Sequence, residues 1–259
     1  MGADWNPTLY KRFEDERTRP ARDLLANVPL TETTQVVDLG CGPGNSTELL
    51  VERFPSANVI GTDSSEAMVA SARERLPNCR FELSDVSTWQ PALAPDLIFA
   101  NAVFQWVPNH ERLLPRLISL LAPNGVLALQ MPDNLNEPSH QLMREVAAQP
   151  AFASAIGDAS RVRAPVLAAS AYYDLLARSG ARVEIWRTAY HHPLSSPSAI
   201  VDWLKATGLR PFLEPLSDEL KARFLVEYES KIARAYPAQV DGRSLLAFPR
   251  LFIVAQRSS

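Results

Sequence analysis

The chain alternates short apolar runs with amphipathic stretches as far as Pro132, a pattern typical of a parallel sheet flanked by helices. Five apolar runs predict strands at 35–38, 58–62, 80–83, 96–100 and 125–130. Amphipathic stretches predict helices at 46–54, 65–76 and 111–121, and Pro115 should make the last helix kink or start late. The alternation predicts one doubly wound α/β sheet.

The pattern changes after Pro132, where helical stretches are interrupted by prolines. We expect two helical insertions, at 133–170 and 191–246, within a single domain that covers 1–259. Helices are predicted at 171–179, 198–207 and 217–236, the last with an apolar stripe at four-residue spacing. The last two strands of the sheet are expected at 182–190 and 248–256.

Composition and charge narrow the class of protein. With 259 residues and 46% hydrophobic content, the chain can bury one core, or one core and a small cap. A net charge of -3 gives no basic field for nucleic acid. Cys41 and Cys79 form no disulfide framework, no apolar run approaches the roughly 20 residues of a membrane helix, and no signal-peptide pattern is present. We therefore expect a cytoplasmic enzyme with no membrane association and no obligate protein partner.

The most informative motif is DLGCGPG at 38–44, which joins the first strand to the first helix. Its glycines allow a ligand to approach the backbone closely. A dinucleotide is disfavoured, because its fingerprint is G-x-G-x-x-G and because Asp38 would repel a pyrophosphate. S-Adenosylmethionine has no phosphate and carries a cationic ammonium and sulfonium, so an acid beside the turn favours its binding. A glycine turn without a ligand is the remaining alternative.

Two further acids are predicted at the carboxyl ends of the next strands, where ligands bind in such sheets. Asp63 would accept the ribose hydroxyls of an adenosine, although Asp followed by two serines is also an ordinary helix N-cap. Asp85 would accept the adenine amino group, and would otherwise be a loop acid. Asn101 follows the fourth strand, and Gln105 and Trp106 lie just beyond it, where they could face the methionyl group and the acceptor.

Several segments carry a resemblance to a known family. DLGCGPGNST (38–47), GTDSS (61–65) and SDVSTWQP (84–91) resemble the cofactor motifs of class I S-adenosylmethionine-dependent methyltransferases. DWNPTLYKRFEDERTRPA (4–21), ANAVFQWVPNH (100–110), LALQMPDNLNEPSHQLMREVA (127–147), ATGLRPFL (206–213) and LLAFPRLFIVAQR (245–257) resemble the trans-aconitate 2-methyltransferase family. The resemblance covers nearly the whole chain and is weakest at 150–169.

This resemblance implies a Rossmann-like, seven-stranded, mostly parallel sheet, with an antiparallel last strand and a helical cap over the cofactor site. It implies methyl transfer from S-adenosylmethionine to a carboxylate of trans-aconitate, giving a monomethyl ester and S-adenosylhomocysteine. The residues expected to bind the cofactor are Asp38, Gly40, Cys41, Gly42, Gly44, Asp63, Ser64, Asp85, Val86 and Asn101.

An anionic tricarboxylate acceptor requires a basic pocket, and arginine suits it because its planar fork binds a carboxylate through two hydrogen bonds. The residues expected to bind the acceptor are Tyr10, Arg19, Gln105, Trp106, Tyr172, Arg187, His191, Arg210 and Arg250, with Tyr173 and His192 as neighbours of two of them. For each, surface exposure, core packing or helix capping is the alternative. The adjacent histidines predict no metal site, because neighbouring strand residues point to opposite faces.

The implied reaction needs no general base, because a carboxylic acid is already ionised at neutral pH. We therefore expect no catalytic acid–base residue, and expect catalysis to come from placement and exclusion of water. Alternatives are a methyltransferase for an amine, a phenol or another carboxylic acid, and a non-catalytic S-adenosylmethionine-binding module. An amine or phenol acceptor would need a deprotonating group, which the histidines could supply.

Overall fold

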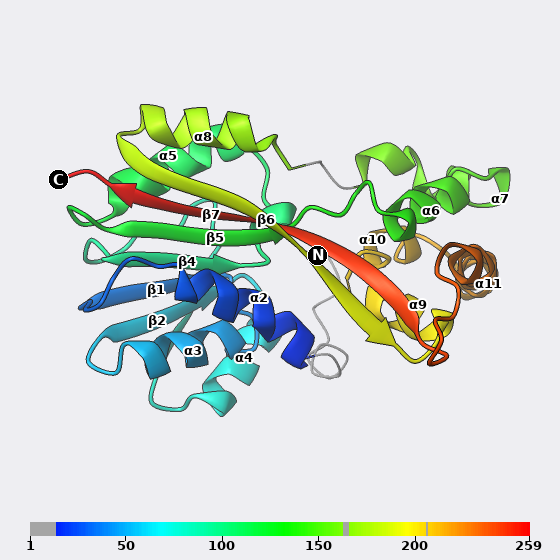
Figure 1. Cartoon of the computed structure of the whole chain (residues 1–259), viewed down its shortest axis with the longest axis horizontal. Helices are drawn as coiled ribbons and strands as arrows, with labels where there is room; N and C mark the ends of the chain where they lie inside the picture. The colour runs from blue at the N-terminus through cyan, green and yellow to red at the C-terminus, as the bar shows by residue number, and fades with distance from the viewer. Residues whose placement is uncertain (1–13, 163–165, 206) are drawn as a thin grey trace. The chain divides into compact units, whose positions relative to one another are not determined.

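The computed structural model describes residues 14–162, 166–205 and 207–259. Within them, seven strands form one sheet in the order β3-β2-β1-β4-β5-β7-β6 (Figure 1). The strands are β1 (Gln35–Leu39), β2 (Asn58–Asp63), β3 (Arg80–Leu83), β4 (Leu97–Asn101), β5 (Val126–Pro132), β6 (Ala181–Leu194) and β7 (Ser244–Arg257). The first five pair in parallel, in the order 3-2-1-4-5. The predicted seven-stranded, mostly parallel fold is confirmed.

The last two strands extend well beyond their predicted ends, to 14 residues each. In β6 the buried Tyr190, His192 and Leu194 alternate with exposed residues, which is the period of a strand. Two histidines and Pro193 hid this period, so 191–194 was expected to be part of a helical insertion. In Figure 1 the arrowhead of β7 points opposite to that of β5, so β7 is the antiparallel strand that the resemblance implied.

Helices flank the sheet within the first of two compact units, which holds the described residues up to Met131 together with Val166–Arg187 and Leu251–Ser259. These helices are α2 (Glu14–Ala26), α3 (Asn45–Arg53), α4 (Glu66–Arg75), α5 (His110–Leu120) and α8 (Ala169–Arg178), with the short η1 (Phe104–Trp106). The α3 helix packs on β1 and β2, α4 on β2 and β3, and α5 on α8.

The α5 helix begins at His110 and continues through Pro115, so the predicted late start is wrong. The predicted alternative, a kink at Pro115, stays a prediction. Proline removes one helical hydrogen bond. Leu114 and Leu117 on either side of it are fully buried, and their burial stabilises the helix despite the missing bond.

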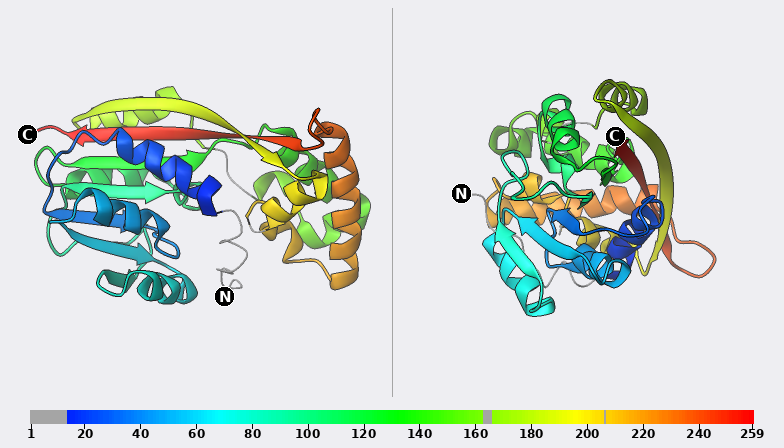
Figure 2. Two further views of the ribbon diagram at one scale, coloured as in Figure 1. Left: turned by 60° about the horizontal axis from the view of Figure 1, so that its bottom comes forward. Right: turned by 90° about the vertical axis from the view of Figure 1, so that its left-hand side faces the viewer.

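The second compact unit comprises the described residues of Pro132–Pro165 and Thr188–Arg250. Its helices are α6 (Pro138–Ala147), α7 (Pro150–Ile156), η2 (Ala159–Arg161), α9 (Pro197–Lys205), α10 (Arg210–Leu213) and α11 (Asp218–Ala235). The long α11 (Figure 2) packs against α6, α7 and α9. Phe224, Tyr228 and Ile232 of the predicted apolar stripe are fully buried. No helix in the described part of the chain is long and apolar enough to span a membrane.

Candidate functional site

A pocket of about 530 Å³ lies at the carboxyl ends of the first four strands, within the first unit. Its volume is in the range usual for small-molecule sites. It is lined by residues at or after the carboxyl ends of β1 (40–43, 45, 46), β2 (63, 64, 68), β3 (85–87) and β4 (101–103, 106–108). The predicted cofactor residues among them are Gly40, Cys41, Gly42, Asp63, Ser64, Asp85, Val86 and Asn101. The sheet therefore brings together residues that lie as far apart in the sequence as Gly40 and Pro108.

The turn after β1 depends on glycine for its backbone conformation. Gly40, Gly42 and Gly44 have φ angles of 70°, 54° and 91°, in the left-handed region that side chains disfavour. At Gly40 a Cβ atom would also lie 2.2 Å from Cγ2 of Val103, which lines the pocket. Gly44 is the N-cap residue of α3 and does not line the pocket.

The backbone N–H groups of this turn are used within the protein. Gly40 and Cys41 donate to the Thr62 carbonyl at 2.7 and 2.9 Å, Gly44 donates to the Cys41 carbonyl, and Gly42 donates to Oδ2 of Asp63 at 2.9 Å. A phosphate-binding loop instead directs such groups at the anion. The turn is thus poorly suited to a pyrophosphate, in agreement with the prediction from its glycine spacing.

Asp38 lies behind the turn rather than in the pocket wall. Its side chain is fully buried, and Oδ2 accepts hydrogen bonds of 2.7 Å from the hydroxyls of Ser46 and Thr47 in α3. In the described part of the chain, Oδ1 has no hydrogen-bond donor. Burial raises the pKa of Asp38 to about 6, while the two hydroxyls act in the opposite direction. Asp38 therefore ties the glycine turn to the helix that follows it.

The other two acids hold local turns and also line the pocket. Oδ1 of Asp63 accepts from the Ser65 backbone N–H at 2.9 Å. Ser65, not Asp63, caps α4, since its hydroxyl accepts from the N–H of Met68. Asp85 is exposed, and its Oδ1 accepts from both the N–H and the hydroxyl of Ser87, at 2.7 and 2.5 Å. The Asp85 carboxylate has more acceptor positions than these bonds use, so it can accept further hydrogen bonds.

The segment after β4 is held by a sharp backbone turn. Ala102 has a φ angle of 58°, which is strained for a residue with a side chain. Its N–H donates to the Gln130 carbonyl at 2.9 Å, and its carbonyl accepts from Nε2 of Gln105 at 2.6 Å. Trp106 is 39% exposed and lines the pocket, whereas Gln105 supports the turn and does not line it.

Arg116 is a supporting residue that the sequence did not reveal. From α5 its guanidinium donates to the carbonyls of Trp89, Ser87 and Val86, at 2.8, 3.1 and 3.4 Å. Val86 and Ser87 line the pocket. No motif connects an arginine to a loop about 30 positions earlier, so only the fold shows this role.

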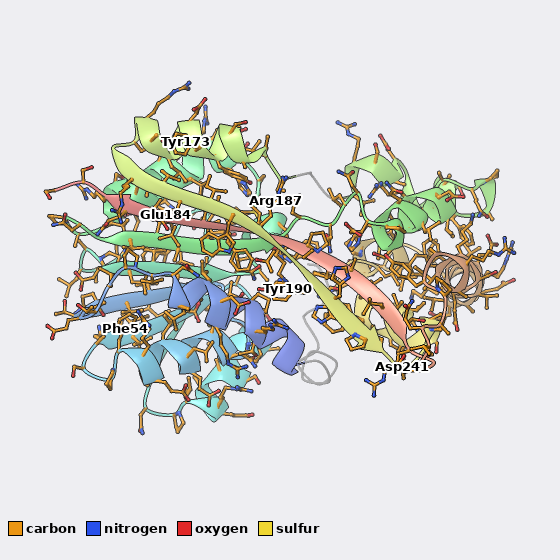
Figure 3. The ribbon with its side chains drawn as sticks, in the orientation of Figure 1. Phe54, Tyr173, Glu184, Arg187, Tyr190 and Asp241 are labelled. Carbon is orange, nitrogen blue, oxygen red and sulfur yellow. The ribbon has the colours of Figure 1, made fainter. Side chains whose placement is uncertain are left out.

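Tyr172 was expected to bind the acceptor, but the structure places it in the core. Its ring is fully buried, and its hydroxyl lies 2.7 Å from Nδ1 of His110. Nε2 of His110 lies 2.9 Å from the Phe104 carbonyl in η1. Burial of the α8 apolar face turns Tyr172 inward, where it supports η1. Tyr173 is exposed on α8 (Figure 3).

Two further predicted acceptor residues in the described part of the first unit do not line the pocket. Arg19 on α2 and Arg187 on β6 are both exposed (Figure 3 labels Arg187). Tyr10 lies outside the described residues. Their predicted role stays a prediction.

In the second unit, the predicted acceptor residues have three different environments. His191 is exposed on β6, and Arg210 forms an ion pair of 2.7 Å with Glu214 one helical turn away. Arg250 is only 4% exposed, and its guanidinium lies 4.9 Å from the centre of the Phe248 ring. A buried arginine is unusual and costly, so Arg250 is the strongest of the three candidates.

Neither cysteine takes part in a disulfide bond, and the described residues contain no cluster of His, Cys, Asp and Glu that could hold a metal ion. Cys41 lines the pocket, but burial raises the pKa of its thiol. The thiol is therefore neutral at physiological pH and is no nucleophile in this state.

Comparisons with known proteins decide the family. A family model for a methyltransferase domain matches residues 10–212. A trans-aconitate 2-methyltransferase from Variovorax paradoxus is 62% identical over 257 residues, 99% of each chain. The enzyme of that name from Methylobacterium radiotolerans is 61% identical over 260 residues, covering 99% of this chain and 100% of the relative. The chain belongs to the trans-aconitate 2-methyltransferase family.

Comparison with solved structures agrees on the fold. The YcgJ protein from Bacillus subtilis shares its fold, with a TM-score of 0.60 at 13% identity over 93% of this chain and 99% of that one. The predictions of an S-adenosylmethionine-dependent methyltransferase and of S-adenosylmethionine as its cofactor are confirmed.

Proposed function

We propose that this enzyme methylates a carboxylate oxygen of trans-aconitate, giving a monomethyl ester and S-adenosylhomocysteine. The observation that carries the proposal is the 61–62% identity to trans-aconitate 2-methyltransferases over nearly the full length of both chains. S-Adenosylmethionine supplies an electrophilic methyl group on a cationic sulfur. The chain's own residues then have to bind the cofactor and the acceptor, orient them toward each other and exclude water.

The donor set of the pocket suits this cofactor. Asp63 would accept the ribose hydroxyls and Asp85 the adenine amino group, because both carboxylates line the pocket and a carboxylate only accepts hydrogen bonds. The turn at Gly40 and Gly42 would carry the methionyl end, because its N–H groups are bonded within the protein and its carbonyl oxygens suit a cationic ammonium. The carboxylate of Asp38 behind the turn adds a negative charge that favours this cationic ammonium.

The lining of the pocket also fits an acceptor that needs no base. Among the described residues that line it there is no histidine, lysine or tyrosine, and the Cys41 thiol is held neutral. A phenol or amine would have to lose a proton, whereas a carboxylate is already ionised. Placement of the carboxylate oxygen in line with the methyl group is then the main task of the protein.

Recognition of the acceptor's three carboxylates falls to basic residues that the pocket itself does not contain. Arg250 is the leading candidate, since a buried guanidinium gives a strong charge-assisted hydrogen bond when it meets a carboxylate. His191 and Arg210 of the second unit, and Arg19 and Arg187 of the first, are the further candidates.

Methyl transfer from labelled S-adenosylmethionine to a panel of acceptors tests the proposal. The panel contains trans-aconitate, cis-aconitate, citrate and isocitrate, with an amine and a phenol as controls. We expect turnover of trans-aconitate with little for its cis isomer, and a product that mild base returns to trans-aconitate. Transfer to the amine or phenol instead, or binding of S-adenosylhomocysteine without methylation of any carboxylate, would refute it.

A further inference from the structure

Asn101 and Gln130 form a side-chain pair at the pocket end of β4 and β5. The two residues are direct neighbours in the parallel register of these strands. Gln130 is fully buried, and its Nε2 donates to Oδ1 of Asn101. Asn101 is only partly buried and lines the pocket.

This hydrogen bond fixes which end of the Asn101 amide faces the pocket. A side-chain amide has an acceptor oxygen and a donor nitrogen on opposite sides of one carbon. Because the oxygen is turned toward Gln130, the NH₂ group is turned away from it. In the described part of the chain no group accepts a hydrogen bond from this NH₂. Asn101 thus offers the pocket two unused N–H donors.

Hydrogen bonds on both sides of Asn101 favour this orientation. The next residue, Ala102, adopts its left-handed turn while its N–H donates to the Gln130 carbonyl, so Gln130 binds both the side chain of Asn101 and the backbone after it. A similar pair elsewhere shows the opposite polarity. At the amino ends of β1 and β2, Nδ2 of Asn58 donates to Oε1 of Gln35 at 2.8 Å. The direction of such a bond is therefore a property of the site, not of the residue types.

We propose that Asn101 is a specificity-determining residue that donates a hydrogen bond to a carboxylate of a bound ligand, and that Gln130 is the positioning residue that orients it. The inference rests on the proposed function, in which both ligands carry carboxylates: the methionyl carboxylate of the cofactor and those of the acceptor. A donor in the pocket wall after β4 favours an anionic oxygen, and it would discriminate against a positively charged amine acceptor.

The test compares Asn101→Asp with Asn101→Leu. Asparagine and aspartate have the same shape, and the aspartate still accepts from Gln130, but it presents a negative oxygen to the pocket. Leucine removes the donor without adding charge. Calorimetry measures the Kd of S-adenosylhomocysteine, and steady-state kinetics measures the KM for trans-aconitate. Asn58→Asp serves as the matched control in the pair at the other end of the sheet, and thermal unfolding checks that each variant folds.

We expect Asn101→Asp to raise at least one of the two constants by about tenfold or more, and Asn101→Leu to raise the same constant by a smaller factor. A rise confined to S-adenosylhomocysteine identifies the methionyl carboxylate as the partner, and a rise confined to the KM identifies the acceptor. Asn58→Asp should change neither. Equal effects of Asp and Leu, or changes below about twofold in both constants, would overturn the proposal.

Gln130→Glu tests the positioning role without changing Asn101. A glutamate can only accept, so Asn101 would turn its NH₂ toward it and present its oxygen to the pocket. We expect the same constant to rise, and an unchanged constant in a folded Gln130→Glu variant would contradict the role of Gln130. A wild-type enzyme that binds S-adenosylhomocysteine but leaves trans-aconitate unmethylated would refute the proposed function alone. In that case the binding constants of the two Asn101 variants decide the inference.

Discussion

The two compact units use polar groups in different ways. In the first unit the pocket is shaped by the backbone: three glycines with positive φ, the strained Ala102, and carbonyls held by Arg116. In the second unit the notable polar groups are buried side chains among aromatic rings. The Arg250 guanidinium lies over Phe248, and the His192 ring lies 4.7 Å from that of Trp203.

The difference explains why a site formed by the backbone can be predicted from the sequence more readily than a site formed by side chains. A backbone site requires particular residues at consecutive positions, because neighbouring φ angles must combine into one turn. A side-chain site can be assembled from residues on separate elements, so it leaves no motif. We infer that the first unit binds the cofactor and that the buried Arg250 of the second unit contributes to the choice of acceptor.

The largest effect is expected from Gly40→Ala. The new Cβ would lie 2.2 Å from Val103, in a backbone conformation that alanine disfavours. Strain and overpacking together predict a loss of about 3 kcal/mol or more in the free energy of unfolding, measured with urea. Gly42→Ala is the matched control, because its Cβ would have no atom within 4 Å, and it should lose only about 1–2 kcal/mol. Equal losses would show that close packing at Gly40 does not matter.

The buried Asp38 predicts a pH-dependent stability. Its pKa is raised from 3.8 to about 6 by burial, so the folded state favours the protonated form. Stability relative to Asp38→Asn should therefore be greatest below about pH 4 and fall as the pH rises to about 6, by about 3 kcal/mol at most. Urea unfolding at several pH values measures the difference. A difference that stays constant or grows over this range would contradict the assigned environment of Asp38.

Arg250→Met tests whether the second unit contributes to binding of the acceptor. If this buried guanidinium binds an acceptor carboxylate, its loss should raise the KM for trans-aconitate by about 10- to 100-fold. The Kd of S-adenosylhomocysteine should stay unchanged. Arg223→Met on the exposed face of α11 is the control. An altered Kd for S-adenosylhomocysteine with an unchanged KM would assign Arg250 to the cofactor instead of the acceptor. Arg250→Lys is a second variant, which keeps the charge.

Arg116→Met should give the opposite result with a smaller effect. Three carbonyls of the loop at 86–89 would lose their donor, so the loop that lines the pocket should loosen. We expect a roughly tenfold weaker binding of S-adenosylhomocysteine, with little change in the KM for trans-aconitate. Arg112→Met, exposed on the same helix, is the control. A variant that lost stability but bound S-adenosylhomocysteine normally would show that Arg116 supports only the fold and not the pocket.

Much of the fold and of the pocket could be predicted from the sequence. The parallel strands are apolar runs of ordinary length, and the residues that follow four of them meet at one edge because the strands run the same way. That is why Asp63, Asp85 and Asn101 could be placed together. The carboxyl end of β6 could not be predicted, because burial there alternates through His191, His192 and Pro193, which carry no apolar signal.

Contacts between distant segments account for the rest. Asp38 begins the glycine-rich motif, where an acid is expected to face the ligand. Instead, its side chain is buried and accepts hydrogen bonds from two hydroxyls of the next helix. Tyr172 was a candidate because its hydroxyl could donate a hydrogen bond to the acceptor. Only the packing of α8 shows that this hydroxyl bonds to His110 in the core. The Asn101–Gln130 pair depends on strand register, which the sequence of either strand alone does not give.

The most direct test of the account is the pH dependence of kcat with trans-aconitate as the acceptor. A pocket that positions an ionised carboxylate and supplies no base predicts a kcat that is constant between about pH 7 and 9. A kcat that rises through this range with the titration of a single group would reveal a general base, and would contradict the account of the site.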